Sequence, residues 1–179
     1  MRRTAVILCL AALPLGVAAA ASAGTAGVAR SRTVHSAQAS TRDDGRLEAT
    51  FTAQPVSVTP NLGMVELIVS GTGTVQGFGT ATEVVGVVED QAASPCGAGG
   101  ASDSAERRIV MQGGVLELHE TAMLCMTASG PRVTGTYRVD GQASTGIFAG
   151  ARGAGNVAVD PATGHDTVSG TLILRSPEA

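Results

Sequence analysis

Apolar and polar residues alternate along most of the chain after residue 45, with a period of two. The first such segment covers residues 46–54. Its side chains fall on two faces, one apolar and one polar: Leu47, Ala49, Phe51 and Ala53 against Glu48, Thr50, Thr52 and Gln54. This alternation is typical of a strand with one buried face and one solvated face.

Further strands are predicted between turns rich in glycine, proline and asparagine. Residues 55–63 break the first strand, and residues 71–79, which contain four glycines, predict a bend or bulge. The turn at 112–114 predicts a hairpin between its neighbours. The remaining strands are predicted at 64–70, 80–90, 105–111, 115–126, 133–140, 146–159 and 167–174.

The pattern contains seven or eight strands and no convincing helix. Short strands at even spacing are typical of a β-sandwich or a β-barrel. Glycine makes up 24 of the 179 residues and relieves crowding at barrel bends. We therefore predict an all-β domain at 45–176, a seven- to eight-stranded antiparallel β-barrel, with a β-sandwich as the alternative.

The first 44 residues have a different pattern. Arg2 and Arg3 precede an apolar run at 4–17, and Ala21-Ser22-Ala23 fits the small-residue rule for signal peptidase. We predict a signal peptide at 1–23. We also predict a flexible leader at 24–44, because apolar residues there follow neither the strand period of 2 nor the helix period of 3.6. A secreted protein without a membrane span follows, because no second run approaches the ~20 apolar residues that a spanning helix needs.

Composition excludes several function classes. The chain has no lysine, its 12 arginines face 15 acids, and aromatic residues make up 2%. A nucleic-acid partner is disfavoured, because such binding needs a basic surface and often aromatic stacking. Neither a G-x-S-x-G hydrolase motif nor a G-x-G-x-x-G nucleotide loop is present. We expect no cofactor.

Two cysteines, Cys96 and Cys125, remain after the predicted signal peptide. In an exported chain such a pair favours one disulfide. The predicted hairpin supports this pairing, because it returns Cys125 toward the loop that carries Cys96. A metal site is disfavoured, since the cysteines and the histidines at 35, 119 and 165 have no metal-ligand spacing.

Glu117 and His119 are the candidate catalytic residues. They share one face of the strand at 115–126, whereas Leu116, Leu118 and Leu124 share the other. If the leucines face the core, Glu117 and His119 form a solvated outer pair. If the barrel interior lies on their side, they become a buried acid–base pair with perturbed pKa values.

Tyr137, Arg138 and Arg152 are the candidate ligand-binding residues. Tyr137 is the only tyrosine, and a buried phenol needs a hydrogen-bond partner that either the core or a ligand can supply. Arg138 lies on the opposite face of the same strand. Arg152 either satisfies carbonyls at a strand end or faces a ligand.

The segment 135–153, GTYRVDGQASTGIFAGARG, resembles the C-terminal strand, glycine turn and Phe-x-x-Ala-x-Gly segment of allene oxide cyclase and dirigent-like barrels, a family with uncharacterised secreted actinobacterial members. The glycine-rich segment 71–79 is weakly similar to a strand of the same family. The resemblance implies an eight-stranded barrel, often trimeric, with a cavity for an apolar ligand. It carries over no site residues, but we expect Phe148 to plug the barrel.

Three functions are therefore open. The first is a non-enzymatic extracellular barrel that binds a small apolar ligand or a partner. The second is an isomerase, cyclase or stereo-directing protein, for which Glu117, His119, Tyr137 and Arg138 are the candidates. The third is a structural secreted protein that self-associates.

Overall fold

The computed structural model of the protein describes residues 45–92, 94 and 96–175. The predicted signal peptide and the predicted leader lie outside these residues. The described chain forms eight strands and one short 3₁₀ turn: β1 (Arg46–Asn61), β2 (Met64–Val75), β3 (Gly79–Asp90), β4 (Ala101–Met111), β5 (Gly114–Thr127), β6 (Gly130–Val139), η1 (Gly146–Phe148), β7 (Ala154–Asp160) and β8 (His165–Thr171).

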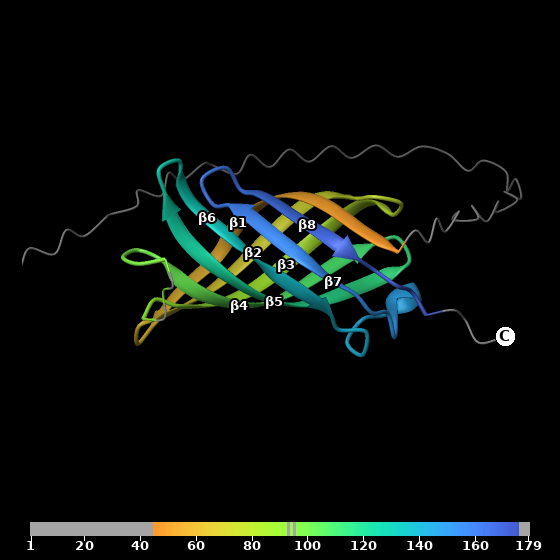
Figure 1. Ribbon diagram of the computed structural model, residues 1–179. Helices are drawn as coiled ribbons and strands as arrows, with labels where there is room; N and C mark the ends of the chain where they lie inside the picture. The colour runs from red at the N-terminus through yellow and green to blue at the C-terminus, as the bar shows by residue number, and fades with distance from the viewer. Residues whose placement is uncertain (1–44, 93, 95, 176–179) are drawn as a thin grey trace, which may run out of the picture. The chain divides into compact units, whose positions relative to one another are not determined.

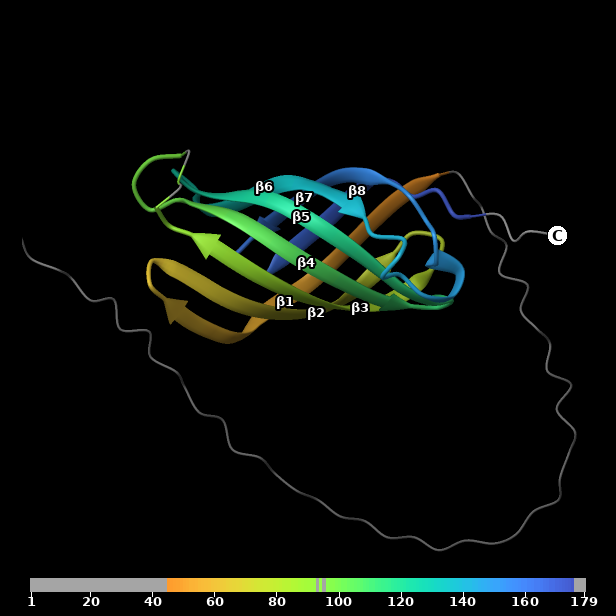
Figure 2. The same cartoon turned by 90° about the horizontal axis from the view of Figure 1, so that it is seen from below.

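Each strand pairs with the next in antiparallel register, and the sheet closes on itself (Figures 1 and 2). β1 completes the circle by pairing with β8, from Arg46 opposite Thr171 to Thr52 opposite His165. The prediction of an antiparallel barrel is confirmed with eight strands, and the alternative sandwich is wrong. Closure gives every strand two neighbours, and the part of β1 beyond Ala53 extends past β8 and pairs with β2.

The first two strands are longer than the sequence pattern predicts. β1 continues through residues 55–61 because the chain absorbs one extra residue as a register shift between Pro55 and Ser57. A bulge of this kind places a proline without breaking the strand. β2 continues through Gly71 and Gly73, and a Cβ at Gly73 would lie 2.0 Å from the Thr50 carbonyl oxygen. The glycines therefore permit close strand approach here, and the predicted bend is confined to the turn after Val75.

The predicted strand at 146–159 is wrong in its first half. Gly146 and Gly150 have φ angles of 64° and 75°. These angles lie in the left-handed region, which glycine adopts readily but which a regular strand does not contain. The chain instead makes η1 and enters β7 only at Ala154. This detour carries Phe148 into the end of the barrel, where it is fully buried, as expected.

Inward side chains at the η1 end form a dense apolar core. The rings of Phe78 and Phe148 lie 5.2 Å apart between centroids, tilted by 58°. Large buried side chains surround them: Leu47, Phe51, Ile109, Leu116 and Leu118. This end of the barrel is therefore closed by packed side chains.

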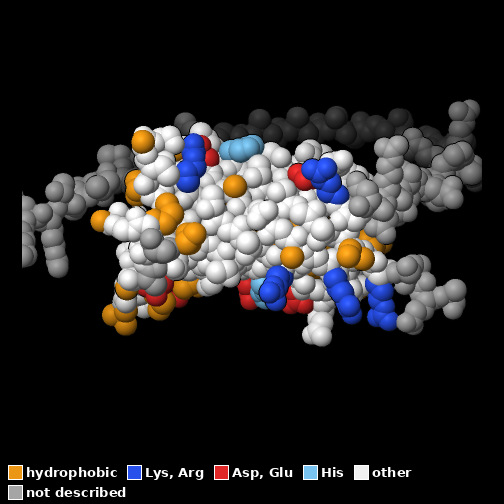
Figure 3. Space-filling model, in the orientation of Figure 1, with side chains coloured by type: hydrophobic (Ala, Val, Ile, Leu, Met, Phe, Trp, Pro, Cys, Tyr) orange, Lys and Arg blue, Asp and Glu red, His pale blue; other side chains and the backbone are white. Residues whose placement is uncertain are grey.

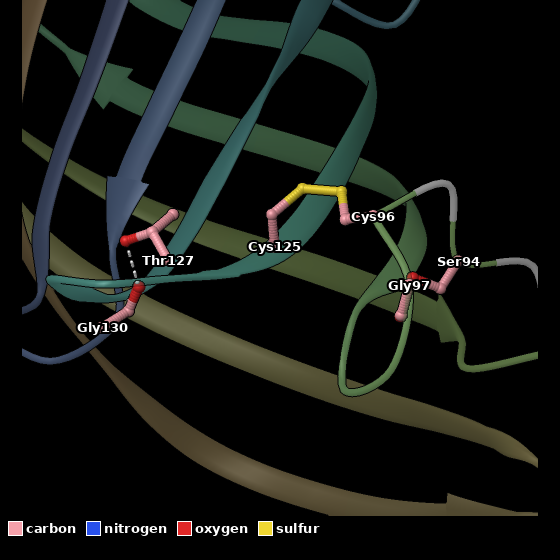
Figure 4. Close-up of a disulfide and its surroundings, with 6 residues drawn as sticks. All are labelled: Ser94, Cys96, Gly97, Cys125, Thr127 and Gly130. Atoms are coloured by element: carbon pink, nitrogen blue, oxygen red, sulfur yellow. Dashed lines mark hydrogen bonds between the residues drawn. A yellow bond between two sulfur atoms is a disulfide. The ribbon is translucent and has the colours of Figure 1, made fainter.

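A disulfide lies at the opposite end. Cys96, in the β3–β4 loop, is bonded to Cys125 near the end of β5, and their Cα atoms are 5.5 Å apart (Figure 4). The neighbouring turns are held by hydroxyl groups: Ser94 donates to the Gly97 carbonyl at 2.8 Å and Thr127 donates to the Gly130 carbonyl at 2.7 Å. The predicted pairing is confirmed, and it ties the longest loop of the open end to the barrel wall.

Candidate functional site

A cavity of about 220 Å³ occupies the end of the barrel opposite η1. It lies inside the sheet, because its wall consists of side chains from the inward positions of the strands. Alanines and prolines make up part of this wall, and its larger aliphatic side chains are Leu67, Val69, Val85, Val87, Leu124, Val133, Val157 and Val159. Valine and alanine side chains are too short to fill the barrel as the phenylalanines do at the other end.

The approach to this cavity is also apolar. Val58, Leu62 and Met64 on the β1–β2 hairpin and Met126 near the end of β5 are exposed. Figure 3 shows hydrophobic side chains gathered at the end of the molecule where these turns lie. Exposed apolar patches of this kind often mark ligand-binding grooves or interaction sites.

The floor of the cavity is a buried ionic cluster around Arg107 of β4, which is 1% exposed. Its guanidinium donates through Nε to Glu120 Oε1 at 2.5 Å and through Nη1 to Asp166 Oδ2 at 2.8 Å. Nη1 also donates to Glu83, and Nη2 to Glu120 Oε2 at 3.3 Å. The four side chains come from β3, β4, β5 and β8, so the cluster joins opposite sides of the barrel.

Three carboxyl groups share one guanidinium in this cluster. Burial raises the pKa of Glu83 to about 7; Arg107 opposes this rise, and the charge of Asp166 adds to it. Burial raises the pKa of Glu120 as well. Burial alone would lower the pKa of Arg107, but its carboxylate neighbours raise it above the ordinary value, so the guanidinium stays charged.

Among the residues that the structure describes, three buried carboxyl oxygens have no hydrogen-bond partner: Glu83 Oε1, Asp103 Oδ1 and Asp166 Oδ1. Buried polar atoms without partners are rare in folded proteins, because each loses its hydration without compensation. Asp103 and Asp166 line the cavity. The cavity thus combines an aliphatic wall with unpartnered hydrogen-bond acceptors.

The candidate catalytic residues lie on the outer face of the barrel. Leu116 and Leu118 are buried, so Glu117 and His119 on the other face point away from the interior. Glu117 accepts a hydrogen bond from Arg108 at 2.6 Å, and His119 Nε2 lies 3.0 Å from Asp140 Oδ2. Of the two alternatives, the structure therefore shows the outer pair, and the buried acid–base pair is wrong.

Glu117 and His119 do line a wide groove of about 810 Å³ on the outer surface of the sheet. Ile68, Val84 and Val88 add exposed aliphatic side chains to it. Arg108 pairs with Glu117 there, and His119 lies 3.9 Å from Glu106. None of the unpartnered buried carboxyl oxygens identified among the described residues belongs to the lining of this groove.

The candidate ligand-binding residues do not line the cavity either. Tyr137 points inward but packs in the core, and its hydroxyl donates to the Thr171 carbonyl at 3.3 Å, so its partner is the protein. Burial, with the nearby Glu48 charge, raises the pKa of Tyr137 to about 12. Arg138 and Arg152 are exposed, and the backbone of Arg152 forms an isolated bridge with Ile173.

The interior charges were missed by sequence reasoning, although the sequence holds a signal for them. Glu120 has the same parity as Leu116, Leu118 and Leu124, so it must point to the leucine side of its strand. Arg107 alternates in the same way with Ile109. A charged residue on an otherwise apolar strand face indicates a buried polar site. The candidate residues Glu117 and His119 lie instead on the polar face of their strand.

Within the described ranges, no group of three or more His, Cys, Asp or Glu side chains is arranged to hold a metal ion. The same residues contain no helix long and apolar enough to cross a membrane. No family model, curated protein or solved structure matches the chain, so the resemblance to allene oxide cyclase and dirigent-like barrels stays a prediction.

Proposed function

We propose that this protein is a secreted, non-enzymatic barrel that binds a small, mainly apolar molecule in the open half of its interior. The observation that carries the proposal is the cavity of about 220 Å³, which has an aliphatic wall and unpartnered acceptors at Asp103 and Asp166. Binding pockets commonly combine an apolar wall with a few polar groups that orient the ligand. The disulfide supports secretion, because such bonds persist in oxidising compartments.

The volume limits the ligand. Pockets for drug-sized molecules usually measure about 300–1,000 Å³, so this cavity suits a smaller molecule or one that extends past the rim. Burial of about 200 Å² of apolar ligand surface contributes roughly 5 kcal/mol before the entropic penalty of association. Because 5 kcal/mol corresponds to a dissociation constant of about 0.2 mM, and the penalty weakens it, we expect dissociation constants in the millimolar range.

The cavity wall contains no serine, threonine, cysteine, histidine or tyrosine, so it offers no nucleophile of those types. One observation favours the alternative of an isomerase: Glu120 lines the cavity, and its raised pKa suits a general acid or base. Recovery of bound ligand after long incubation, followed by mass spectrometry and NMR, separates the two functions. Unchanged ligand is expected, and a rearranged product would favour the isomerase.

Binding is tested with N-phenyl-1-naphthylamine, a neutral fluorophore that brightens in apolar sites, and with 1-hexanol as competitor. Val87→Phe fills the cavity and should abolish displaceable fluorescence. Val88→Phe is the matched control, because residue 88 is adjacent in the chain but points outward and is 40% exposed. Absence of displaceable binding in the wild type, or equal binding by both variants, would contradict the proposal.

A further inference from the structure

Two carboxyl groups stand side by side on the inner wall of the open end. Glu89 of β3 and Asp103 of β4 are direct partners in the β3–β4 register, and both line the cavity. Directly paired residues on one face of an antiparallel sheet have Cβ atoms about 4.5–5.5 Å apart. We call Glu89 and Asp103 the mouth pair.

The mouth pair has no counter-charge among the described residues. Neither side chain takes part in an ion pair there, whereas the carboxyl groups of the floor share Arg107. Asp103 is 5% exposed and its Oδ1 has no hydrogen-bond partner. Burial, followed by the charge of Glu89, raises the pKa of Asp103 to about 6, and burial raises the pKa of Glu89. Like charges placed directly opposite on a sheet are destabilising, so a bound cation would relieve the pair.

An independent observation on the floor points to the same kind of ligand. Asp166 Oδ1 is unpartnered, and its residue is only 2% exposed. Arg107 already donates to Glu83, Glu120 and Asp166, so its charge is committed to these carboxylates. Ionised carboxylates only accept hydrogen bonds. The described part of the interior therefore has more uncommitted hydrogen-bond acceptors than donors, which disfavours an anionic ligand.

We propose that the mouth pair binds the ammonium group of a small amphipathic amine whose apolar part occupies the cavity. This inference rests on the proposed ligand-binding function and adds the charge of the ligand. An ammonium group has three donors and no acceptor, which matches carboxylates that lack partners. A hard metal ion fits less well, because calcium takes six to eight oxygen ligands and the mouth pair supplies two carboxyl groups.

The test compares three ligands of equal chain length, hexylamine, 1-hexanol and hexanoate, by isothermal titration calorimetry at pH 8. The purified chain keeps its disulfide. Hexylamine is expected to bind at least about tenfold more tightly than hexanol, because hydrogen bonds to charged groups are stronger than neutral ones. Hexanoate is expected to bind weakest.

Two sets of substitutions locate the effect. The double variant Glu89→Gln, Asp103→Asn should bind hexanol as the wild type does and lose the preference for hexylamine. It should also fold, since it removes repulsion and keeps side-chain shape; denaturant unfolding checks this. Glu106→Gln is the matched control, because it removes an acidic charge from an exposed, outward position of β4 and should leave the preference intact.

The outcomes separate the two proposals. Equal binding of hexylamine and hexanol, or a preference that survives in the double variant, overturns the ammonium site while hexanol binding still supports the apolar cavity. Failure of all three ligands overturns both. Hexylamine binding that is lost in the double variant, without hexanol binding, supports the ammonium site alone. Displacement of hexylamine by equimolar calcium chloride would assign the mouth pair to a metal ion and overturn the proposal.

Discussion

The two ends of the barrel interior differ in how densely their side chains pack and in the charges that they contain. At the η1 end, Phe78, Phe148 and large aliphatic side chains pack into the hydrophobic core cluster. At the other end, valines and alanines leave a cavity of about 220 Å³, and the charged groups inside the barrel gather on its floor and wall. The strands run through both halves without interruption.

This difference shows how one continuous sheet can separate stability from binding. Large buried side chains stabilise the fold in proportion to the apolar area that they remove from water. A cavity and unpartnered buried carboxyl oxygens oppose folding. Sites that break the ordinary rules of packing and pairing are where function is expected, and in this protein they share one half of the barrel.

The largest expected effect comes from Arg107, which lies between the two halves. Arg107→Gln leaves Glu83, Glu120 and Asp166 buried without their guanidinium, and removal of one partner from a buried ionic group costs about 3–5 kcal/mol. We expect the free energy of unfolding in urea at pH 7.5 to fall by this amount. A loss below about 1 kcal/mol would mean that water reaches the cluster and screens it.

Phe148→Ala tests the closed half directly. Phe148 is fully buried against Phe78, and such truncations cost about 3–5 kcal/mol through lost transfer energy and a new cavity. Val159→Ala on the cavity wall should lose only about 1–2 kcal/mol, because its side chain already borders open space. Urea unfolding of both variants measures this difference between the closed and open halves. Equal losses of unfolding free energy would contradict it.

The disulfide is the main covalent support of the open half. Cys96→Ser, Cys125→Ser and the double variant should each lose about 2–4 kcal/mol, since each abolishes the same cross-link over 29 residues. Urea unfolding without reductant measures the three losses. Free thiols in the native wild-type protein, found by thiol titration, would contradict the pairing.

The interior carboxyl groups predict a pH dependence for the unliganded protein. The pKa of Glu83, which faces Arg107, Asp166 and Glu120, is raised to about 7, and that of Asp103, which faces Glu89, to about 6. A group whose pKa is raised in the folded state stabilises the protein at low pH and loses this effect as pH rises through the folded pKa.

Unfolding free energy should therefore fall by about 1–3 kcal/mol between pH 5 and pH 8. Asp140 and Asp160, which are half-buried on the outside of the barrel, have lowered pKa values and titrate below this window. Glu83→Gln should flatten the profile, whereas Arg107 substitution should not. A flat profile over this window would show that the interior carboxyl groups are ionised at both ends of it and would contradict the prediction.

The smallest effect is expected one residue away from the largest. Arg108 points outward, is well exposed and pairs with Glu117 on the barrel surface. Arg108→Gln should change the unfolding free energy by less than about 1 kcal/mol, because exposed ion pairs contribute little. A several-fold larger loss of unfolding free energy for Arg107→Gln than for Arg108→Gln would show that burial inside the barrel determines how much an arginine stabilises the fold. Similar losses for both would remove that distinction.

Several features of this protein are determined by the sequence alone. The period of two in Leu47, Ala49, Phe51 and Ala53 predicts a half-buried strand, and this strand face is buried in the structure. Turn residues separate the strands, and the hairpin at 112–114 brings Cys125 back toward Cys96. These features depend on neighbouring residues and local geometry, and the sequence records them directly.

Only the tertiary structure decides which strand face becomes the interior and which distant residues meet there. Alternation places Glu120 and Glu117 on opposite faces, but closure of β1 against β8 turns one face inward and the other to solvent. The same closure brings Asp166 to Arg107 across 59 residues. Such contacts depend on barrel closure and register, which no local pattern encodes. Barrel closure therefore decides where the cavity lies and which of the inward charges meet beside it.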